Sequence, residues 1–186
     1  CEQLNVIKNV REGIIDLNLP DGNDLSLYGR LLLDGDINIK AHEDQKHKHR
    51  YAFIFEKILI LVKSTTRLGE IQHTFRECHN LAEYRIETVH SRKTLGRDAR
   101  FKYTLLLARK SNETAFTLYM KTENDREKWL KALNEAMLMI EPLGCKNTDH
   151  NFVLFTFEKP MTCRHCSKFL KGLIHQGYRC KKCDIR

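Results

Sequence analysis

No apolar stretch in this sequence approaches the roughly 18 residues that a transmembrane helix needs. The chain also lacks an initiator methionine and a short apolar run behind a basic start, so it shows no secretory signal peptide. With 41% hydrophobic and 30% charged residues, its composition is ordinary for a soluble globular protein. We therefore expect one or two compact domains cut from a longer protein, whose targeting information lies outside these residues.

The sequence also lacks the residue patterns of a catalytic centre. No nucleophile beside a base, no glycine-rich phosphate loop and no pair of acids stands out. Aromatic residues interleaved with basic ones are too few to indicate a nucleic-acid surface. We therefore expect neither an enzyme nor a nucleic-acid-binding protein.

Positive charge is concentrated at the C-terminal end. The formal net charge is +8, and residues 150–186 hold eight Lys and Arg residues against only Glu158 and Asp184. Such a basic surface favours anionic partners, including phospholipid headgroups, nucleic acid or an acidic protein face. A solvated surface that keeps the protein soluble explains the same charge equally well.

Four of the seven cysteines form two CxxC pairs, Cys163 with Cys166 and Cys180 with Cys183. Without a secretory signal, such pairs indicate metal ligands in a reducing compartment rather than disulfides. We therefore expect a cytoplasmic protein. The remaining cysteines stand alone and are expected to be bystander thiols; they are Cys1, Cys78 and Cys145.

His150 stands at a fixed distance before these pairs. Zinc prefers four thiolate or imidazole ligands in a tetrahedron, and a CxxC turn places two thiolates on one ion. The sequence therefore predicts a structural zinc module over residues 150–186. Its predicted metal ligands follow the spacing His150-x12-Cys163-x2-Cys166-x13-Cys180-x2-Cys183.

Between residues 27 and 122 the sequence favours short strands. Residues 50–55 and 58–63 are rich in β-branched and aromatic side chains, and Asp34-Gly35 is expected to form a turn before a strand at 36–41. Several short strands close together indicate a small antiparallel sandwich or barrel. Further strands are expected at residues 81–90, 100–109 and 114–121.

The apolar period then becomes helical. Thr122 and Asp125 form a plausible capping box at the start of a helix, and Pro142 and Gly144 end it. Its apolar stripe consists of Trp129, Leu133, Ala136, Met137 and Ile140. Residues 1–19 are also predicted to be helical, with Leu4, Ile7, Val10 and Ile14 on one face, and residues 20–26 form a linker.

The order of about seven strands and one amphipathic helix carrying a tryptophan resembles a pleckstrin homology (PH) domain over residues 27–141. The resemblance implies a mostly β fold with some α, in which a bent antiparallel barrel or sandwich is capped by the C-terminal helix. Trp129 would then lie in the core. Residues 142–149 would link this domain to the zinc module.

Residues 150–186 resemble the zinc finger of protein kinase C type, the phorbol-ester/diacylglycerol class. The resemblance extends to Phe152, Phe157, Pro160, Gly172, Leu173, Gln176 and Gly177. It implies two zinc ions per complete finger, one held by His150, Cys180 and Cys183 and the other by Cys163 and Cys166, with the remaining ligands just beyond Arg186.

The rim of this finger departs from the family's membrane-binding pattern. Glu158, Thr162 and Lys171 stand where membrane-binding members present apolar or aromatic side chains, although Phe169 and Leu173 are kept. Each lost apolar side chain forfeits about 1.5–3 kcal/mol of burial, and a Lys near an anionic surface returns only about 1 kcal/mol. We therefore expect a weak or absent response to diacylglycerol.

The tandem order resembles the Vav family of Rho-family guanine nucleotide exchange factors, as do Tyr28-Gly29-Arg30 and Gln176-Gly177-Tyr178-Arg179-Cys180. In that family a preceding Dbl homology domain carries the exchange activity and engages the Rho-family GTPase. The resemblance implies that residues 1–19 are the tail of that domain and that this chain is its non-catalytic regulatory and scaffolding tandem. The alternative is a membrane-recruitment module that senses phosphoinositide and diacylglycerol.

Lys40-x7-Lys48-x-Arg50 fits the loose basic pattern of phosphoinositide-binding PH domains. Basic side chains at the mouth of a strand pair can hold phosphates through charge-assisted hydrogen bonds. A solvated charged loop is the other interpretation. If the contact exists, we expect these three residues to make it and to recruit the protein from the cytoplasm to the plasma membrane.

Overall fold

The computed structural model describes residues 2–44, 46–87, 103–111, 114–141, 150–163, 169–170 and 177–183. The chain divides into two compact units, residues 1–139 and residues 140–186. Within the described residues, neither α-helix combines the length and the apolar character that crossing a lipid bilayer requires.

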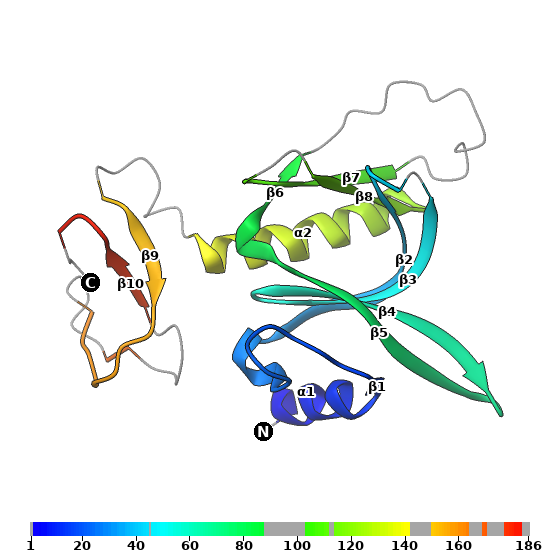
Figure 1. Cartoon of the computed structure of the whole chain (residues 1–186), viewed down its shortest axis with the longest axis horizontal. Coiled ribbons are helices and arrows are strands. Elements are labelled where there is room, and N and C mark those ends of the chain that lie inside the picture. The colour runs from blue at the N-terminus through cyan, green and yellow to red at the C-terminus, as the bar shows by residue number, and fades with distance from the viewer. Residues whose placement is uncertain are drawn as a thin grey trace. The chain divides into compact units, whose positions relative to one another are not determined.

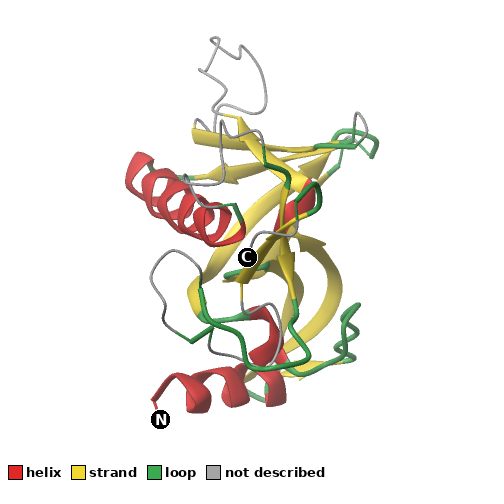
Figure 2. Ribbon diagram, turned by 90° about the vertical axis from the view of Figure 1, so that its left-hand side faces the viewer, coloured by secondary structure: helices red, strands yellow, loops and turns green. Residues whose placement is uncertain are grey.

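The first unit is built on one sheet of eight strands in the order β1-β5-β4-β3-β2-β8-β7-β6 (Figure 1). The short strand β1 pairs in parallel with β5, and all other neighbours are antiparallel. The bent sheet with its C-terminal helix confirms the predicted fold class (Figure 2). The strands are β1 (Ile14–Ile15), β2 (Leu31–Ala41), β3 (His47–Phe55), β4 (Ile58–Arg67), β5 (Glu70–Asn80), β6 (Tyr84–Glu87), β7 (Tyr103–Arg109) and β8 (Ala115–Met120).

Helix α2 (Glu123–Ile140) covers one face of this sheet. The predicted cap is present, because the Asp125 N–H donates to Thr122 Oγ1 at 3.1 Å. Trp129 is buried as predicted, and a methyl group added to Gly35 of β2 would lie 3.7 Å from its ring. The same helix buries Leu133 and Ala136 completely, so its apolar stripe closes the core.

Strands β3 and β4 contain unbroken buried runs, residues 52–55 and 58–62. A strand with one face in water alternates between apolar and polar residues, so an unbroken apolar run indicates that both faces are covered. Helix α2 covers one face. The second cover comes from the N-terminal segment of the chain.

This N-terminal segment consists of helix α1 (Glu2–Glu12), strand β1 and the 3-10 helix η1 (Leu25–Tyr28). Its turn is held by the Leu19 N–H, which donates to Asn23 Oδ1 at 3.0 Å. Ile7 and Val10 of α1 pack against the cluster that the segment forms with the sheet. The buried members of that cluster are Ile14, Leu17, Leu19, Leu25 and Tyr28 from the segment and Phe53, Phe55, Ile58, Ile60 and Val62 from the sheet.

The segment therefore packs as part of the PH unit. Each buried Leu or Ile side chain contributes about 1.5–3 kcal/mol, so Ile14, Leu17 and Leu19 fasten the segment firmly. The sequence predicted that residues 1–19 and the linker 20–26 are separate from the PH domain. In the structure both belong to the same compact unit as the PH sheet. That residues 1–19 end an upstream helical domain stays a prediction.

One expectation about strands is wrong, and one strand was missed. Asp34 and Gly35 do not turn, because both lie inside β2, opposite Phe53 and Ala52 of β3. Strand β5 was not among the expected strands. Its polar and apolar residues do not alternate regularly, and the pairing with β4 shifts register between Leu61 and Val62, which interrupts the period of two.

The second unit holds the antiparallel pair β9 (Phe152–Phe155) and β10 (Gly177–Cys180). Thr162 and Phe169 form an isolated bridge beside it. A two-stranded sheet is marginally stable in water by itself. This unit therefore needs a further source of stability, and its cysteines are the available source.

Candidate metal centre and sheet pocket

The pairing of β9 with β10 brings His150 beside two cysteines. Cys180 ends β10 opposite Phe152, and one step further the Lys181 N–H donates to the Asn151 carbonyl at 2.8 Å. His150 is the residue before Asn151, so it lies next to Cys180. The turn that follows β10 carries Cys183 into the same place.

The possible ligand atoms of His150, Cys180 and Cys183 all lie within 4.8 Å of one another. His150 Nδ1 is 3.1 Å from Cys183 Sγ. Tetrahedral zinc, with a Zn–S bond of about 2.3 Å and a Zn–N bond of about 2.1 Å, holds its ligand atoms about 3.6 Å apart. Two thiols and an imidazole at this separation fit three corners of a zinc site.

The surroundings of the Cys180 thiol favour its ionised form, the thiolate. Burial raises its pKa, but the backbone N–H groups of Cys183 and Lys182 and the His150 side chain donate hydrogen bonds that outweigh burial and lower the pKa to about 6. The thiolate is the form that binds a metal. This electrostatic setting exists without any ion and supports a metal-binding role.

Of the other predicted zinc ligands, the structure describes Cys163. Cys163 is half-buried and is not part of the group found among the described residues. Cys166 lies outside the described residues. The second site, to which the resemblance assigns Cys163 and Cys166, stays a prediction.

The structure does not bring the three predicted lipid contacts together. Lys48 and Arg50 of β3 lie opposite Ile39 and Ile37 of β2, so they share the face of the sheet that α2 covers. Lys40 is on the next position along β2 and therefore lies on the opposite face, beside His47. Successive residues of a strand point to opposite faces of the sheet, so Lys40 is separated from Lys48 and Arg50. A spacing pattern in the sequence does not take this alternation into account.

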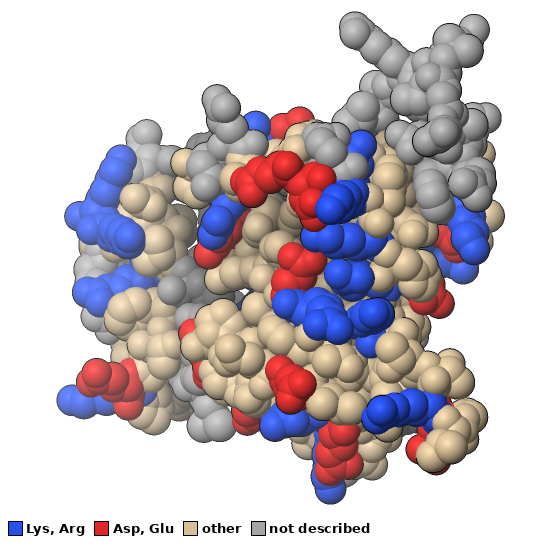
Figure 3. Space-filling view, turned by 45° about the vertical axis from the view of Figure 1, so that its right-hand side comes forward, with Lys and Arg blue, Asp and Glu red and all other residues tan. Residues whose placement is uncertain are grey.

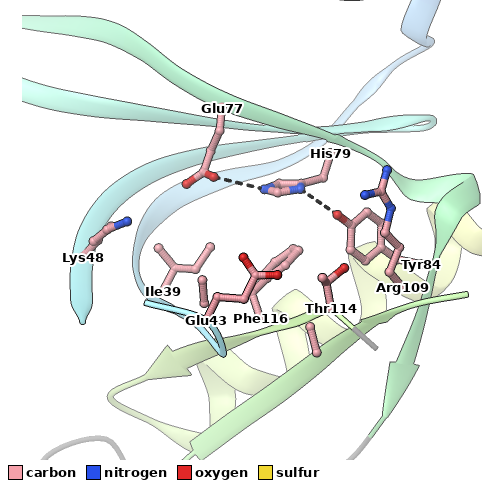
Figure 4. A pocket seen from close by; sticks show the side chains of 11 residues that line it. Ile39, Glu43, Lys48, Glu77, His79, Tyr84, Arg109, Thr114 and Phe116 are labelled. Carbon is pink, nitrogen blue, oxygen red and sulfur yellow. Dashed lines mark hydrogen bonds and ion pairs between the residues drawn. The ribbon is translucent and has the colours of Figure 1, made fainter. Parts of the chain in front are cut away.

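Lys48 lines a pocket of about 240 Å³ on the α2-facing side of the sheet (Figure 4). Polar groups from both halves of the sheet point into it. The lining residues are Ile39, Ala41, Glu43, Lys48, Glu77, His79, Tyr84, Arg109, Thr114, Ala115 and Phe116.

Three polar side chains lie in a row along the pocket wall (Figure 4). His79 Nδ1 lies 3.0 Å from the Tyr84 hydroxyl, and His79 Nε2 lies 3.6 Å from Glu77 Oε2, a distance that allows an ion pair but no direct hydrogen bond. His79 is the main cause of a lowered Glu77 pKa, and Lys48 and Arg50 add to the effect, while burial opposes it. No sequence signal marked this group. Its members are close in sequence, and the short 3-10 helix η2 (Leu81–Glu83) between β5 and β6 brings Tyr84 back to His79.

Carboxylates already compensate the cations of this pocket. Lys48 Nζ lies 2.5 Å from Asp44 Oδ2, and Glu43 and Glu77 also line the cavity. Arg50 Nε is buried without a hydrogen-bond partner among the described residues. Three nearby acids reduce the attraction for a phosphate group, so the pocket is a poor match for a multiply charged headgroup.

The rim of the zinc module is polar where it is described. Glu158 and Thr162 are exposed, and Phe169 is exposed to 67%. Lys171 and Leu173 lie outside the described residues. Among the described rim residues, two exposed polar side chains thus accompany the exposed Phe169, which is consistent with the expected weak response to diacylglycerol.

Family models match both units. The model described as "SOS1/NGEF-like PH domain" matches residues 25–136, more than half of the chain. The chain belongs to this family of PH domains. The model described as "Phorbol esters/diacylglycerol binding domain (C1 domain)" matches residues 150–186. The predicted order of a PH domain followed by a phorbol-ester-type finger is thereby confirmed, and a C1 domain implies zinc binding.

The PH–C1 chain is similar to Vav proteins along nearly its whole length. It is 61% identical over 188 residues to "Protein vav" of Drosophila melanogaster, covering 99% of this chain and 24% of that protein. It is 28% identical over 182 residues to the human "Proto-oncogene vav", covering 98% of this chain and 20% of that protein. The chain thus spans about a quarter or less of the curated relatives it matches. The Vav resemblance predicted from the sequence is confirmed.

Solved structures of Vav1 share the fold. "Apo structure of the activated truncation of Vav1" has a TM-score of 0.76 at 28% identity and covers 99% of this chain and 45% of that one. "Critical structural role for the PH and C1 domains of the Vav1 exchange factor" has a TM-score of 0.75 at 27% identity with the same coverage. The second description assigns the PH and C1 domains of Vav1 a structural role in an exchange factor.

Proposed function

We propose that this chain is the regulatory PH–C1 tandem of a Rho-family guanine nucleotide exchange factor and that it braces the exchange domain. The similarity to Protein vav along nearly the whole chain carries this proposal. The exchange activity itself would belong to a Dbl homology domain in the same protein, and the Rho-family GTPase would be the partner of that domain. The tandem itself would be non-catalytic.

The N-terminal segment gives the brace a physical basis. Helix α1 would end the last helix of the exchange domain, and Ile7 and Val10 anchor it on the PH sheet. Strand β1 then pairs with β5 through Ile14 and Ile15. A helix fixed by both packing and backbone pairing has few orientations open to it. The PH unit would thereby hold the exchange helix in one direction.

Zinc would stabilise the second unit. His150, Cys180 and Cys183 would hold one ion, and Cys163 and Cys166 would contribute to a second ion in the complete finger. When bound, the metal cross-links segments that are distant in sequence and so supplies folding free energy. The finger would then be rigid enough to act as a protein contact.

Membrane recruitment receives less support as the main function. Glu158 and Thr162 leave the finger with a polar rim, and Glu43, Asp44 and Glu77 lie close to the basic residues of the PH pocket. We propose a cytoplasmic protein whose phosphoinositide contact, through Lys48 and Arg50, is secondary to bracing. Nucleic acid is not among the proposed partners.

Nucleotide exchange in solution tests the brace in a longer chain that includes the Dbl homology domain. Leu17→Ala removes a buried anchor of the N-terminal segment and should lower the exchange rate severalfold without any membrane. Leu105→Ala is the matched control, because Leu105 is fully buried in β7, away from that segment. Equal rates for the two variants, both measured where they are folded, would contradict the brace.

A further inference from the structure

The hairpin formed by β4 and β5 projects from the sheet (Figure 1). Its tip, residues 67–71, carries two exposed apolar side chains. Leu68 is 105% exposed and Ile71 is 69% exposed, more than any other large apolar side chain among the described residues. Single apolar residues are ordinary on protein surfaces. Two of them near each other at the projecting end of a hairpin are unusual, because no other part of the described fold covers them.

The tip stands clear of the rest of the sheet. Strand β3 pairs with β4 only as far as Val62, and β1 pairs with β5 only at His73 and Thr74. Beyond these positions the described hairpin is a ribbon of two strands, paired down to Arg67 and Glu70. Both of its faces are therefore accessible to a large partner.

The turn places a leucine where the backbone disfavours one. Leu68 has φ 51° and Gly69 has φ 85°. A two-residue hairpin turn with both φ values positive prefers Asn, Asp or Gly at its first position, because a Cβ crowds the following carbonyl oxygen. Neither the backbone conformation nor packing favours a leucine at position 68. A residue in such an unfavourable conformation indicates that its side chain has a function.

Basic side chains lead up to this tip. Lys63 and Arg67 are exposed at alternate positions of one face of β4, and Arg76 is exposed at the register shift of β5. Figure 3, which brings this side of the molecule forward, shows Lys and Arg side chains gathered across it.

We propose that the hairpin tip docks on an anionic lipid bilayer, with Leu68 and Ile71 entering the acyl boundary and Lys63 and Arg67 meeting the headgroups. At this end of the hairpin the exposed basic side chains, Lys63, Arg67 and Arg76, outnumber the carboxylate of the tip, Glu70. Apolar side chains with a net basic surround match a surface that is negatively charged outside and apolar beneath. This contact requires no headgroup pocket, so it differs from the one predicted for Lys40, Lys48 and Arg50. It goes beyond the proposed bracing and does not depend on it.

Vesicle sedimentation with the full chain tests the contact. The protein should bind vesicles of phosphatidylcholine with phosphatidylserine, and added salt should weaken the binding. The double variant Leu68→Asn/Ile71→Thr should lower the partition coefficient about tenfold or more, since it removes two apolar side chains. Asn suits the first turn position and Thr suits a strand, so the fold should be at least as stable as before.

Leu138→Gln is the matched control, because it removes an exposed apolar side chain of α2 outside the hairpin. It should leave the partition coefficient unchanged. No binding by the unaltered chain, or equal binding by the double variant, would overturn the proposal. If sedimentation velocity instead shows that the double variant abolishes self-association, the tip is an interface between copies and the lipid proposal is wrong.

A fluorescence variant locates the contact. The chain has a single tryptophan, Trp129, which is buried in the core. Ile71→Trp therefore adds an exposed reporter whose emission should shift to the blue on phosphatidylserine-containing vesicles and not on phosphatidylcholine alone. Binding without any shift would mean that another surface touches the membrane and would refute insertion of the tip.

Discussion

His150 Nδ1 lies 3.1 Å from Cys183 Sγ, although the two residues are 33 positions apart in the chain. The pairing of β9 with β10 creates this proximity before any metal is considered. A bond to a shared ion would close a long loop, and closing long loops removes much of the entropy of an unfolded chain. The metal and the fold of the second unit should therefore depend on each other.

Metal content tests this dependence. A chain extended past Arg186 should hold two zinc ions, and Cys180→Ser should remove one or both while raising amide exchange in residues 150–183. Cys78→Ser, which changes a half-buried thiol of the PH unit, is the control and should leave the zinc content unchanged. Elemental analysis showing one zinc or none in the unaltered extended chain would rule out the two-site assignment.

The N-terminal segment offers a stability test with two leucines. Leu17 is 7% exposed and Leu4 is 64% exposed. Leu17→Ala should lower the free energy of unfolding of the PH unit by about 2–4 kcal/mol, because it leaves a cavity beneath the sheet. Leu4→Ala should change it by less than about 0.5 kcal/mol. Urea unfolding followed by Trp129 fluorescence measures both, and equal effects would mean that the segment is not part of this unit.

The three residues predicted to contact phosphoinositide, Lys40, Lys48 and Arg50, should contribute unequally to binding, because they lie on different faces of the sheet. If phosphoinositide binds in the sheet pocket, Lys48→Ala with Arg50→Ala should abolish binding, whereas Lys40→Ala should keep most of it because Lys40 lies on the other face. Flotation with vesicles containing a phosphoinositide measures this. A loss of binding with Lys40→Ala as large as that of the double variant would place the contact outside the pocket.

The depressed pKa of Glu77 predicts a dependence of stability on pH. His79 is its main cause, with help from Lys48 and Arg50. Because the folded pKa lies below the ordinary value of 4.5, the carboxylate stabilises the fold above that value, and this stability is lost as the pH falls through the lower folded pKa. Glu77→Gln should therefore reduce stability at neutral pH and not in strong acid.

The effect should be small. The Glu77 side chain is 42% exposed, so solvent screens it, and we expect a loss of less than about 1 kcal/mol at pH 7. Thermal unfolding across the acidic range measures it, with Glu70→Gln at the exposed hairpin end as the control. A constant difference between Glu77→Gln and the unaltered chain at all pH values would contradict this assignment.

Local patterns predicted most of the PH fold. The apolar runs at residues 52–55 and 58–62, the cap at Thr122 and the helical stripe with Trp129 each depend on neighbours in sequence. The cover supplied by Ile14, Leu17 and Leu19 was missed, because the helix was expected to continue to residue 19. It ends at Glu12, and Ile14 instead pairs with β5 as part of β1.

The candidate sites also divide into those that sequence spacing predicts and those that only the folded structure reveals. Zinc ligands are recognisable from spacing, since thiol and imidazole groups have few other reasons to recur at fixed intervals. The group of Glu77, His79 and Tyr84 depends on the direction in which the 3-10 helix η2 turns the chain, and no side-chain spacing in the sequence marks that. Likewise, the separation of Lys40 from Lys48 follows from strand register, which was not available until the partner strand was known.

The finger provides the last test, of whether this chain acts as a brace or as a membrane sensor. Cys180→Ser, made in a longer chain that includes the exchange domain, removes a buried thiolate from the zinc centre and should unfold the finger. If the finger contacts the exchange domain, the rate of nucleotide exchange on a Rho-family GTPase should fall severalfold in solution. Cys78→Ser controls for the loss of a thiol as such.

The same variants measured on vesicles distinguish the two functions. A brace loses activity equally with and without diacylglycerol, because the missing contact is between protein domains. A sensor keeps its solution rate and loses only the stimulation by diacylglycerol. Glu158 and Thr162 leave the described rim polar, so a full solution rate for Cys180→Ser is the result least expected. That result would transfer the role of the finger from the exchange domain to the membrane.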